Sequence, residues 1–156
     1  MATKTKSTPK SLTTTQVLCA SNAVFTLEGR GRSWTFRIEE GASSNGRPPI
    51  YFVQVLTGPD NNNDFTYLGI YEPHNGWVRL SRASKFAEDS EVVRAIRWYV
   101  GLVFNDHEDQ VEVAGFRIHW SCNCARCGRT LTVASSIDNR LGPECAKLVD
   151  AAGRIY

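Results

Sequence analysis

Four of the five cysteines in this 156-residue chain lie between Cys122 and Cys145. Two of them, Cys124 and Cys127, form a C-x-x-C pair followed by Gly128. This is the pattern of a zinc knuckle, because its tight turn directs backbone N–H groups at the sulfur atoms and glycine accepts the left-handed conformation that follows the second cysteine. The lysine-bearing N-terminus has no continuous apolar segment and is not a secretory signal. We therefore expect a cytoplasmic protein whose reduced thiols bind Zn²⁺.

The residues after the knuckle predict a short hairpin and a helix. Residues 129–134 favour a strand, residues 135–140 a loop, and residues 141–153 a helix with Pro143 in its first turn. Cys145 would then lie near the N-terminus of that helix, where the helix dipole favours a thiolate. A knuckle, a hairpin and a ligand on a helix together predict a treble-clef-like zinc finger.

Two residues before the knuckle compete for the fourth ligand position. Cys122 lies two residues before Cys124, so on an extended strand both side chains point to the same face. His119 lies five residues before Cys124 and needs a bend or a bulge to reach the metal. Charge favours His119, because three thiolates and one histidine leave less net negative charge around Zn²⁺ than four thiolates do. Local geometry and charge leave both residues open.

The cysteine-rich stretch "CARCGRTLTVASSIDNRLGPECA" resembles a zinc-finger family of phages, plasmids and bacterial genomes, with the pattern C-x-x-C-G-R-x-L-T-x-x-x-S-I…G-x-G-P-x-C. Members are mostly classed as a domain of unknown function. The upstream stretches "VQVLTGPDNNNDFTYLGIY", "VRAIRWYV" and "VEV" resemble segments that precede this finger in phage proteins, so the likeness covers roughly residues 50–148. Relatives often have "GIGP" where this chain has "NRLGP", and we expect Asn139 to supply the left-handed turn.

The same resemblance bears on the fourth ligand. Relatives often carry a histidine a few residues before the first knuckle cysteine, and His119 fills that role here with one additional residue of spacing. The resemblance therefore favours His119 over Cys122. The predicted Zn²⁺ ligands are His119, Cys124, Cys127 and Cys145.

Upstream of the cysteines, the hydrophobic pattern predicts an antiparallel sheet with one main helix. Alternating or strongly apolar segments separated by turn residues predict strands at residues 22–28, 33–39, 50–56, 65–71 and 77–80. A helical period over residues 88–104, with Asp89 or Ser90 as its N-cap, predicts a helix that covers the apolar face of the sheet. Residues 111–120 are expected to form a strand that leads into the finger. The predicted fold class is α+β.

We expect three parts along the chain. Residues 1–16 carry Lys4, Lys6 and Lys10 without any acidic residue and predict a disordered basic tail. Residues 17–112 would form the α+β domain and residues 113–156 the zinc finger. No apolar run approaches the length that spans a bilayer, so no membrane partner is expected.

The zinc is expected to be structural. Catalytic zinc keeps an open position for water, whereas this segment offers more candidate ligands than a catalytic site uses. No glutamate lies in an H-E-x-x-H or H-x-E arrangement that could act on a metal-bound water. We therefore do not expect an enzyme.

Six residues in or beside the finger are candidates for contact with nucleic acid, because cations suit phosphates and tryptophan can stack on a base. They are Arg117, Trp120, Arg126, Arg129, Arg140 and Lys147. Three of them have a simpler alternative role: Trp120 can pack against the sheet, and Arg126 and Arg129 can bind the finger's own backbone or thiolates. The net charge of +2 is too small to indicate nucleic acid by itself.

Two functional hypotheses follow. The first is a phage or mobile-element accessory protein that binds DNA or RNA in the cytoplasm of its bacterial host. The second is a protein-binding module that inhibits or redirects a host or defence complex, with zinc as a purely structural element.

Overall fold

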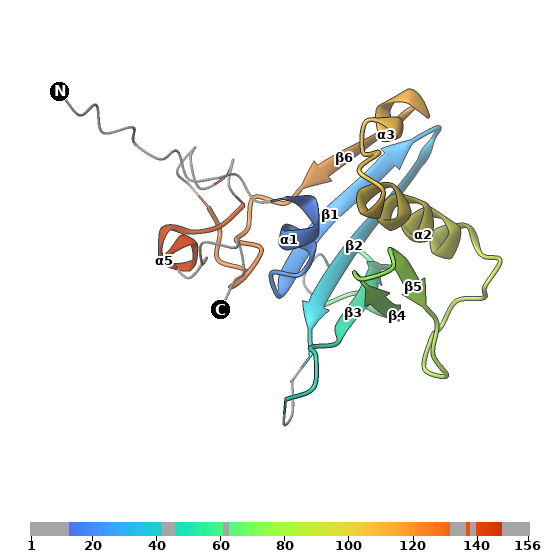
Figure 1. The fold of residues 1–156 in the computed structure, drawn as a ribbon. Coiled ribbons are helices and arrows are strands. Elements are labelled where there is room, and N and C mark those ends of the chain that lie inside the picture. The colour runs from blue at the N-terminus through green and yellow to red at the C-terminus, as the bar shows by residue number, and fades with distance from the viewer. Residues whose placement is uncertain (1–12, 42–45, 61–62, 132–136, 138–139, 148–156) are drawn as a thin grey trace.

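The computed structural model describes residues 13–41, 46–60, 63–131, 137 and 140–147. Its main feature is one curled antiparallel sheet with the strand order β5-β4-β3-β2-β1-β6 (Figure 1). The strands are β1 (Asn22–Gly29), β2 (Arg32–Glu40), β3 (Tyr51–Leu56), β4 (Phe65–Glu72), β5 (Trp77–Arg79) and β6 (Phe116–Trp120). The first five form the meander expected from the sequence, and β6 returns beside β1. The fold class is α+β, as predicted.

Four helices are described: α1 (Thr14–Leu18), α2 (Glu91–Phe104), α3 (Gln110–Val113) and α5 (Pro143–Ala146). Buried residues of α1, α2 and α3 share one hydrophobic core with the sheet, so these three helices pack on the same face. Figure 1 shows α1 and α2 in front of the sheet and α5 beyond its edge. None of the described helices is long and apolar enough to cross a membrane.

Strand alternation explains which side chains enter this core. In β1, Ala23, Phe25 and Leu27 are fully or almost fully buried, and the residues between them are not. Phe25 lies opposite Phe36 of β2, with ring centroids 5.7 Å apart, and 5.2 Å from Tyr99 of α2. Burying a side chain of this size contributes on the order of 2 kcal/mol, so these contacts hold the helices to the sheet.

The opposite side of the sheet, here called the outer face, carries a mixed set of half-buried aromatic, polar and charged side chains. None of its residues belongs to the helix-covered core, and no described helix packs on it. The strand registers place on it Val24, Thr26, Glu28, Thr35, Arg37, Glu39, Phe52, Gln54, Phe65, Tyr67, Ile70, Arg117 and His119.

Three expectations need correction or adjustment. Residues 111–120 are not one strand: α3 ends at Val113, the chain turns at Gly115 with φ of 86°, and only Phe116–Trp120 pairs with β1. The expected tail runs to residue 16, but helix α1 begins at Thr14; residues 1–12 lie outside the described part. The expected boundary at residue 113 falls before β6, which belongs to the sheet. The division into domains stays a prediction.

Candidate metal centre

Three cysteines come together in the segment that follows β6. The sulfur atoms of Cys124, Cys127 and Cys145 all lie within 4.8 Å of one another, and the side chains of Cys124 and Cys145 are buried. Thiolates bound to one tetrahedral Zn²⁺ at about 2.3 Å are about 3.8 Å apart, so only a small contraction would bring these sulfurs into bonding distance. The three residues therefore could hold a metal ion.

The knuckle is built by a small hairpin. The Cys124 N–H donates to the Arg129 carbonyl over 2.8 Å, and the Leu131 N–H donates to the Cys122 carbonyl over 2.7 Å. Gly128 has φ of 77° and its N–H donates to the Cys124 carbonyl over 2.9 Å. A side chain is strained in this conformation, so the glycine lets the turn close tightly around the sulfur atoms.

The third cysteine comes from the start of a helix, as predicted. Gly142 is the N-cap of α5, Pro143 occupies its first turn, and Cys145 follows within the same turn. Of the helix predicted over residues 141–153, the structure describes Pro143–Ala146 as α5, and residues 148–156 lie outside the described part. The predicted strand at residues 129–134 is described only through Leu131, where Thr130 bridges Asn123.

Backbone hydrogen bonds prepare Cys124 to act as a ligand. Burial raises the pKa of its thiol, but N–H groups of Cys127, Gly142 and Arg126 donate to the sulfur, and the balance lowers the pKa from 9.0 to about 7. Burial raises the pKa of Cys145, while Arg126, whose Nη1 donates to the Cys145 sulfur over 3.6 Å, acts in the opposite direction. These hydrogen bonds therefore favour the thiolate form of Cys124, which is the form that binds metal.

The structure does not bring His119 into this cluster. His119 lies on the outer face of β6, opposite Thr26, with its Nε2 3.4 Å from a carboxylate oxygen of Glu28. The cysteine cluster packs instead against Trp120, the next residue, whose side chain points to the other face. Cys122 is exposed and also lies outside the cluster. No described residue completes a fourth position, so the fourth ligand stays a prediction.

Three of the predicted nucleic-acid-binding residues are engaged within the protein. The Trp120 ring packs against Phe25 with centroids 5.2 Å apart, and the Arg140 guanidinium lies over the same ring at 4.7 Å. Arg126 contacts the Cys145 sulfur. The contacts of Trp120 and Arg126 match the simpler roles considered from the sequence, whereas the contact of Arg140 with the Trp120 ring was not expected.

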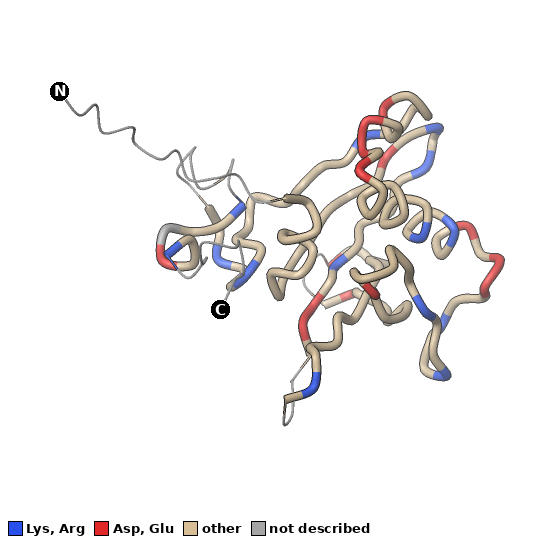
Figure 2. Tube along the Cα trace, viewed as in Figure 1, with Lys and Arg blue, Asp and Glu red and all other residues tan. Residues whose placement is uncertain are grey.

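The remaining three predicted residues are exposed. Arg117 lies on the outer face of β6, Arg129 follows the knuckle, and Lys147 lies just after α5 with its Nζ 3.4 Å from Glu144. Figure 2 shows Lys and Arg residues distributed over the chain around α5. The described part of this region therefore presents cationic groups to solvent close to the cysteines.

Sequence reasoning missed the contribution of the N-terminus to this centre. Val17 and Ala20 are buried in a second core together with Cys124, Ala125, Leu131, Leu141 and Cys145. Asn22 donates from its backbone N–H to the Ala125 carbonyl and from its Nδ2 to the Arg126 carbonyl. The available signal was the stretch T-x-x-Q at Thr13–Gln16, which forms a capping box at the start of α1.

One residue before α5 has a left-handed backbone conformation: Arg140 has φ of 60°. The left-handed turn expected at Asn139 lies outside the described residues and stays a prediction.

A comparison of the sequence with family models gives one match. A family of unknown function, DUF6011, matches residues 119–150, which include the knuckle and α5. No curated protein and no solved structure matched the chain. The match covers the cysteine part of the resemblance described from the sequence, and residues 50–118 lie outside it. Over residues 119–150, the chain is therefore similar to a family whose function is unknown.

Proposed function

We propose that the chain is a small binding protein whose cysteine segment (residues 121–147) is held together by a structural Zn²⁺ and contacts nucleic acid. The observation that carries the metal assignment is the gathering of three cysteine sulfurs, two of them buried, from a knuckle and a helix start. Thiolate-rich sites of this kind are characteristically closed and structural. Binding rather than catalysis is the function that such a site supports.

The position of His119 bears on the fourth ligand. To reach the cysteines, His119 would have to leave the outer face and pass to the other side of β6, which would disturb the pairing with β1. Cys122 lies beyond the end of that strand and needs a smaller rearrangement. We therefore favour Cys122 over the predicted His119. Zinc content that falls in Cys122→Ser but not in His119→Ala, measured by mass spectrometry of the purified proteins, is the expected result; the reverse pattern restores His119.

Support for nucleic-acid binding comes from the exposed cations Arg129 and Lys147 of the cysteine segment and from Arg117, which is exposed on β6. A protein that places such side chains on phosphates releases counterions, so its affinity falls steeply with salt. From the resemblance to phage and plasmid sequences, we extend the proposal to an accessory factor of a mobile element that acts in the cytoplasm of a bacterial host.

The test is a salt series with the zinc-loaded, full-length protein and labelled DNA and RNA, single-stranded and duplex. Arg129→Gln combined with Lys147→Gln should weaken binding and reduce the salt slope by about one for each phosphate that the variant no longer neutralises. Arg94→Gln serves as the matched control, because Arg94 is an exposed cation on α2. Absence of binding to every probe at low salt would end this proposal.

The second candidate is a protein-binding module, and one observation favours it. Trp120, Arg126 and Arg140 are engaged inside the protein, which leaves fewer groups for phosphates than the sequence offered. Under this alternative, one host protein should copurify with the zinc-loaded chain at high salt, where contacts with phosphates fail. Its retention should not change when Arg129 and Lys147 are neutralised.

A further inference from the structure

The outer face of the sheet brings three aromatic rings together on neighbouring strands. Phe52 of β3 and Tyr67 of β4 lie edge to face with centroids 6.1 Å apart. Phe65 of β4 lies beneath the Arg37 guanidinium, 4.2 Å from the ring centroid. All of these side chains are half-buried and none packs into the helix-covered core. A row of rings and one planar cation is therefore presented on this side of the sheet.

The rings are held in place by specific contacts. The Tyr67 hydroxyl shares a hydrogen bond of 2.9 Å with Ser81. A Cβ atom on Gly41 would come within 2.4 Å of the Phe52 ring, so the absence of a side chain at this glycine leaves room for the ring. Arg37 is fixed by hydrogen bonds to Gln54, including one of 2.9 Å from its Nε, and by an ion pair of 3.0 Å with Glu39. Groups fixed in this way lose little conformational entropy on binding.

The carboxylates of this face lie beside basic side chains. Glu39 forms an ion pair of 3.0 Å with Arg37, and Glu28 lies opposite Arg117 in the strand register and 3.4 Å from the His119 Nε2. Arg117 projects from the same face and is exposed. Among the residues named on the outer face, the two arginines Arg37 and Arg117 therefore balance the two carboxylates Glu28 and Glu39.

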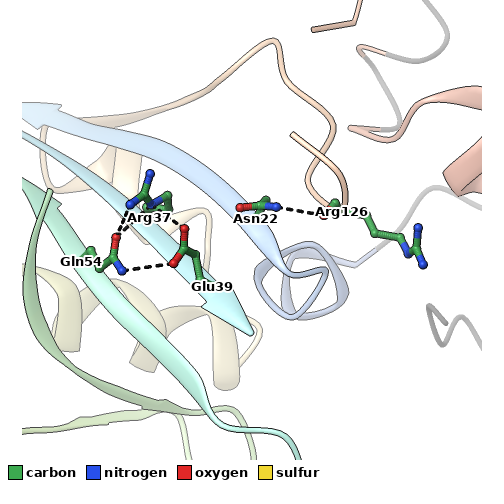
Figure 3. A network of polar contacts seen from close by, with 5 residues as sticks. All are labelled: Asn22, Arg37, Glu39, Gln54 and Arg126. Atoms are coloured by element: carbon green, nitrogen blue, oxygen red, sulfur yellow. Dashed lines mark hydrogen bonds and ion pairs between the residues drawn. The ribbon is translucent and has the colours of Figure 1, made fainter. Parts of the chain in front are cut away.

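The outer face is continuous with the cysteine segment. Asn22, which pairs with Glu39 in the sheet, donates from its Nδ2 to the Arg126 carbonyl over 3.1 Å. Figure 3 shows both features in one view, with the Arg37–Gln54–Glu39 network on the strands and the Asn22–Arg126 contact at their end. A ligand that extends along the face would therefore reach the basic residues around the metal centre.

We propose that the outer face binds a single nucleic-acid strand, whose bases stack on Phe52, Tyr67 and the Arg37–Phe65 pair while its phosphates lead toward the cysteine segment. This inference rests on the proposed nucleic-acid binding and names its substrate class. A single strand fits because its bases have free faces, whereas the bases of a duplex are stacked on one another. The polar groups of Gln54 and Glu39 lie beside the rings, where base edges would fall.

The experiment measures fluorescence anisotropy of labelled oligothymidylate and oligouridylate of about 15 nucleotides, with a duplex of equal length for comparison. Phe52→Ala and Tyr67→Ala should each weaken single-strand binding by about fivefold to 100-fold without changing the salt slope, because neither residue is charged. Tyr67→Phe should retain most of the affinity. Phe104→Ala is the matched control, because Phe104 is an exposed aromatic residue at the end of α2.

A second measurement does not depend on the folding of variants. Ultraviolet crosslinking of the unaltered protein to the same oligonucleotides, followed by peptide mapping, should identify residues of β3 and β4. Crosslinks confined to the cysteine segment, or full affinity in Phe52→Ala and Tyr67→Ala, overturn the outer-face inference while the proposed function survives through Arg129 and Lys147. Equal affinity for duplex and single strand also overturns it. Absence of any binding overturns both.

Discussion

Asn22 joins the two parts of the molecule at the level of a single side chain. It begins β1, and its backbone and side-chain amides both donate to carbonyls of the knuckle, 104 positions further along the chain in the case of Arg126. The side chain is half-buried, so water cannot fully replace this hydrogen bond when the amide is removed. Asn22 thus ties the knuckle to the sheet.

Replacing Asn22 by alanine should lower the free energy of unfolding by about 1 kcal/mol, because the half-buried carbonyl of Arg126 then loses the hydrogen bond that the Asn22 side chain donates. Urea denaturation followed by circular dichroism measures the change. Asn75→Ala is a suitable control, because Asn75 is exposed in the turn between β4 and β5. Equal stability of the two variants would show that the hydrogen bond to Arg126 contributes nothing.

Cys19 gives a prediction for alkaline pH. Burial raises the pKa of its thiol from 9.0 to about 11, so the folded state holds the proton more tightly than the unfolded state does. The resulting contribution to stability is complete below pH 9 and is lost as the pH rises through 11. It amounts to at most about 3 kcal/mol.

The denaturation midpoint of the unaltered protein should therefore fall between pH 8 and pH 11 by more than that of Cys19→Ala, which has no group to ionise at this position. Burial also raises the pKa values of Tyr51 and Tyr71, and the neighbouring Cys19 raises both further, so its removal also reduces the alkaline loss of stability that comes from these tyrosines. Parallel curves for the two proteins would contradict the assignment to Cys19.

At the scale of elements, α1 depends on its capping box and its packing. The helix has five residues, which is too short to be stable alone in water. Thr13 accepts a hydrogen bond from the Gln16 N–H, and the Gln16 side chain accepts one from the Thr13 N–H. These hydrogen bonds satisfy two backbone donors at the start of the helix, and they stabilise the helix where it packs on the cores beneath it.

Thr13→Ala should destabilise the protein by about 1 kcal/mol, because it removes one half of the capping box. Ser90→Ala at the start of α2 should have a smaller effect, because the Ser90 side chain makes no capping bond to its helix. Thermal or chemical denaturation of the two variants checks this order. A larger effect at Ser90 would be inconsistent with the capping geometry of α1.

The sequence predicted the regular elements better than their ends. The five meander strands and α2 follow long periodic stretches, and the burial of Val93, Ile96, Tyr99, Val100 and Val103 matches the helical stripe. By contrast, "VEVAGFRIHW" looks like one strand because β-branched residues and alternation continue through it, while Gly115 separates a helix from a strand. Helix α1 lies in a polar stretch with only two buried side chains, a signal too short for periodicity.

In the cysteine centre, the grouping of the sulfurs was predictable from the sequence, whereas its surroundings were not. Knuckle spacing and the proline of α5 indicated that Cys124, Cys127 and Cys145 gather, because local geometry decides it. The position of His119 depends on which face of β6 packs against the cores, and that follows from tertiary pairing with β1. The links from Val17, Ala20 and Asn22 are long-range: the capping box at Thr13–Gln16 indicates that a helix begins there but not what the helix packs against.

At the scale of the whole molecule, the two cores meet through α1 and Trp120. Leu18 belongs to the core of the sheet and Val17 to the core of the cysteine segment, while Trp120 packs against both. Loss of order around the cysteines should therefore weaken the sheet domain without abolishing it. The buried residues of the sheet core include none of the three clustered cysteines.

Removal of metal by a chelator should lower the thermal midpoint and change the tryptophan fluorescence through Trp120, while the far-ultraviolet circular dichroism of the sheet is largely retained. Readdition of Zn²⁺ should restore both signals, because metal binding is coupled to folding of the segment that provides the ligands. Complete unfolding on chelation, or a thermal midpoint that does not change, would contradict the two-core arrangement.

The pairing of β1 with β6 has a consequence for synthesis. Strand β1 pairs with β2 through a short hairpin. The partners of its other edge and of the apolar side chains of α1 are translated much later. The hydrogen bond between Thr14 of α1 and Glu108, for example, spans 94 positions of the chain. At a translation rate of about 5–20 residues per second, this interval is on the order of 5–20 s. During that time the nascent chain exposes an unpaired strand edge, which is a site for aggregation or for chaperone binding. Fragments that end after β5 should therefore be less soluble than the full chain.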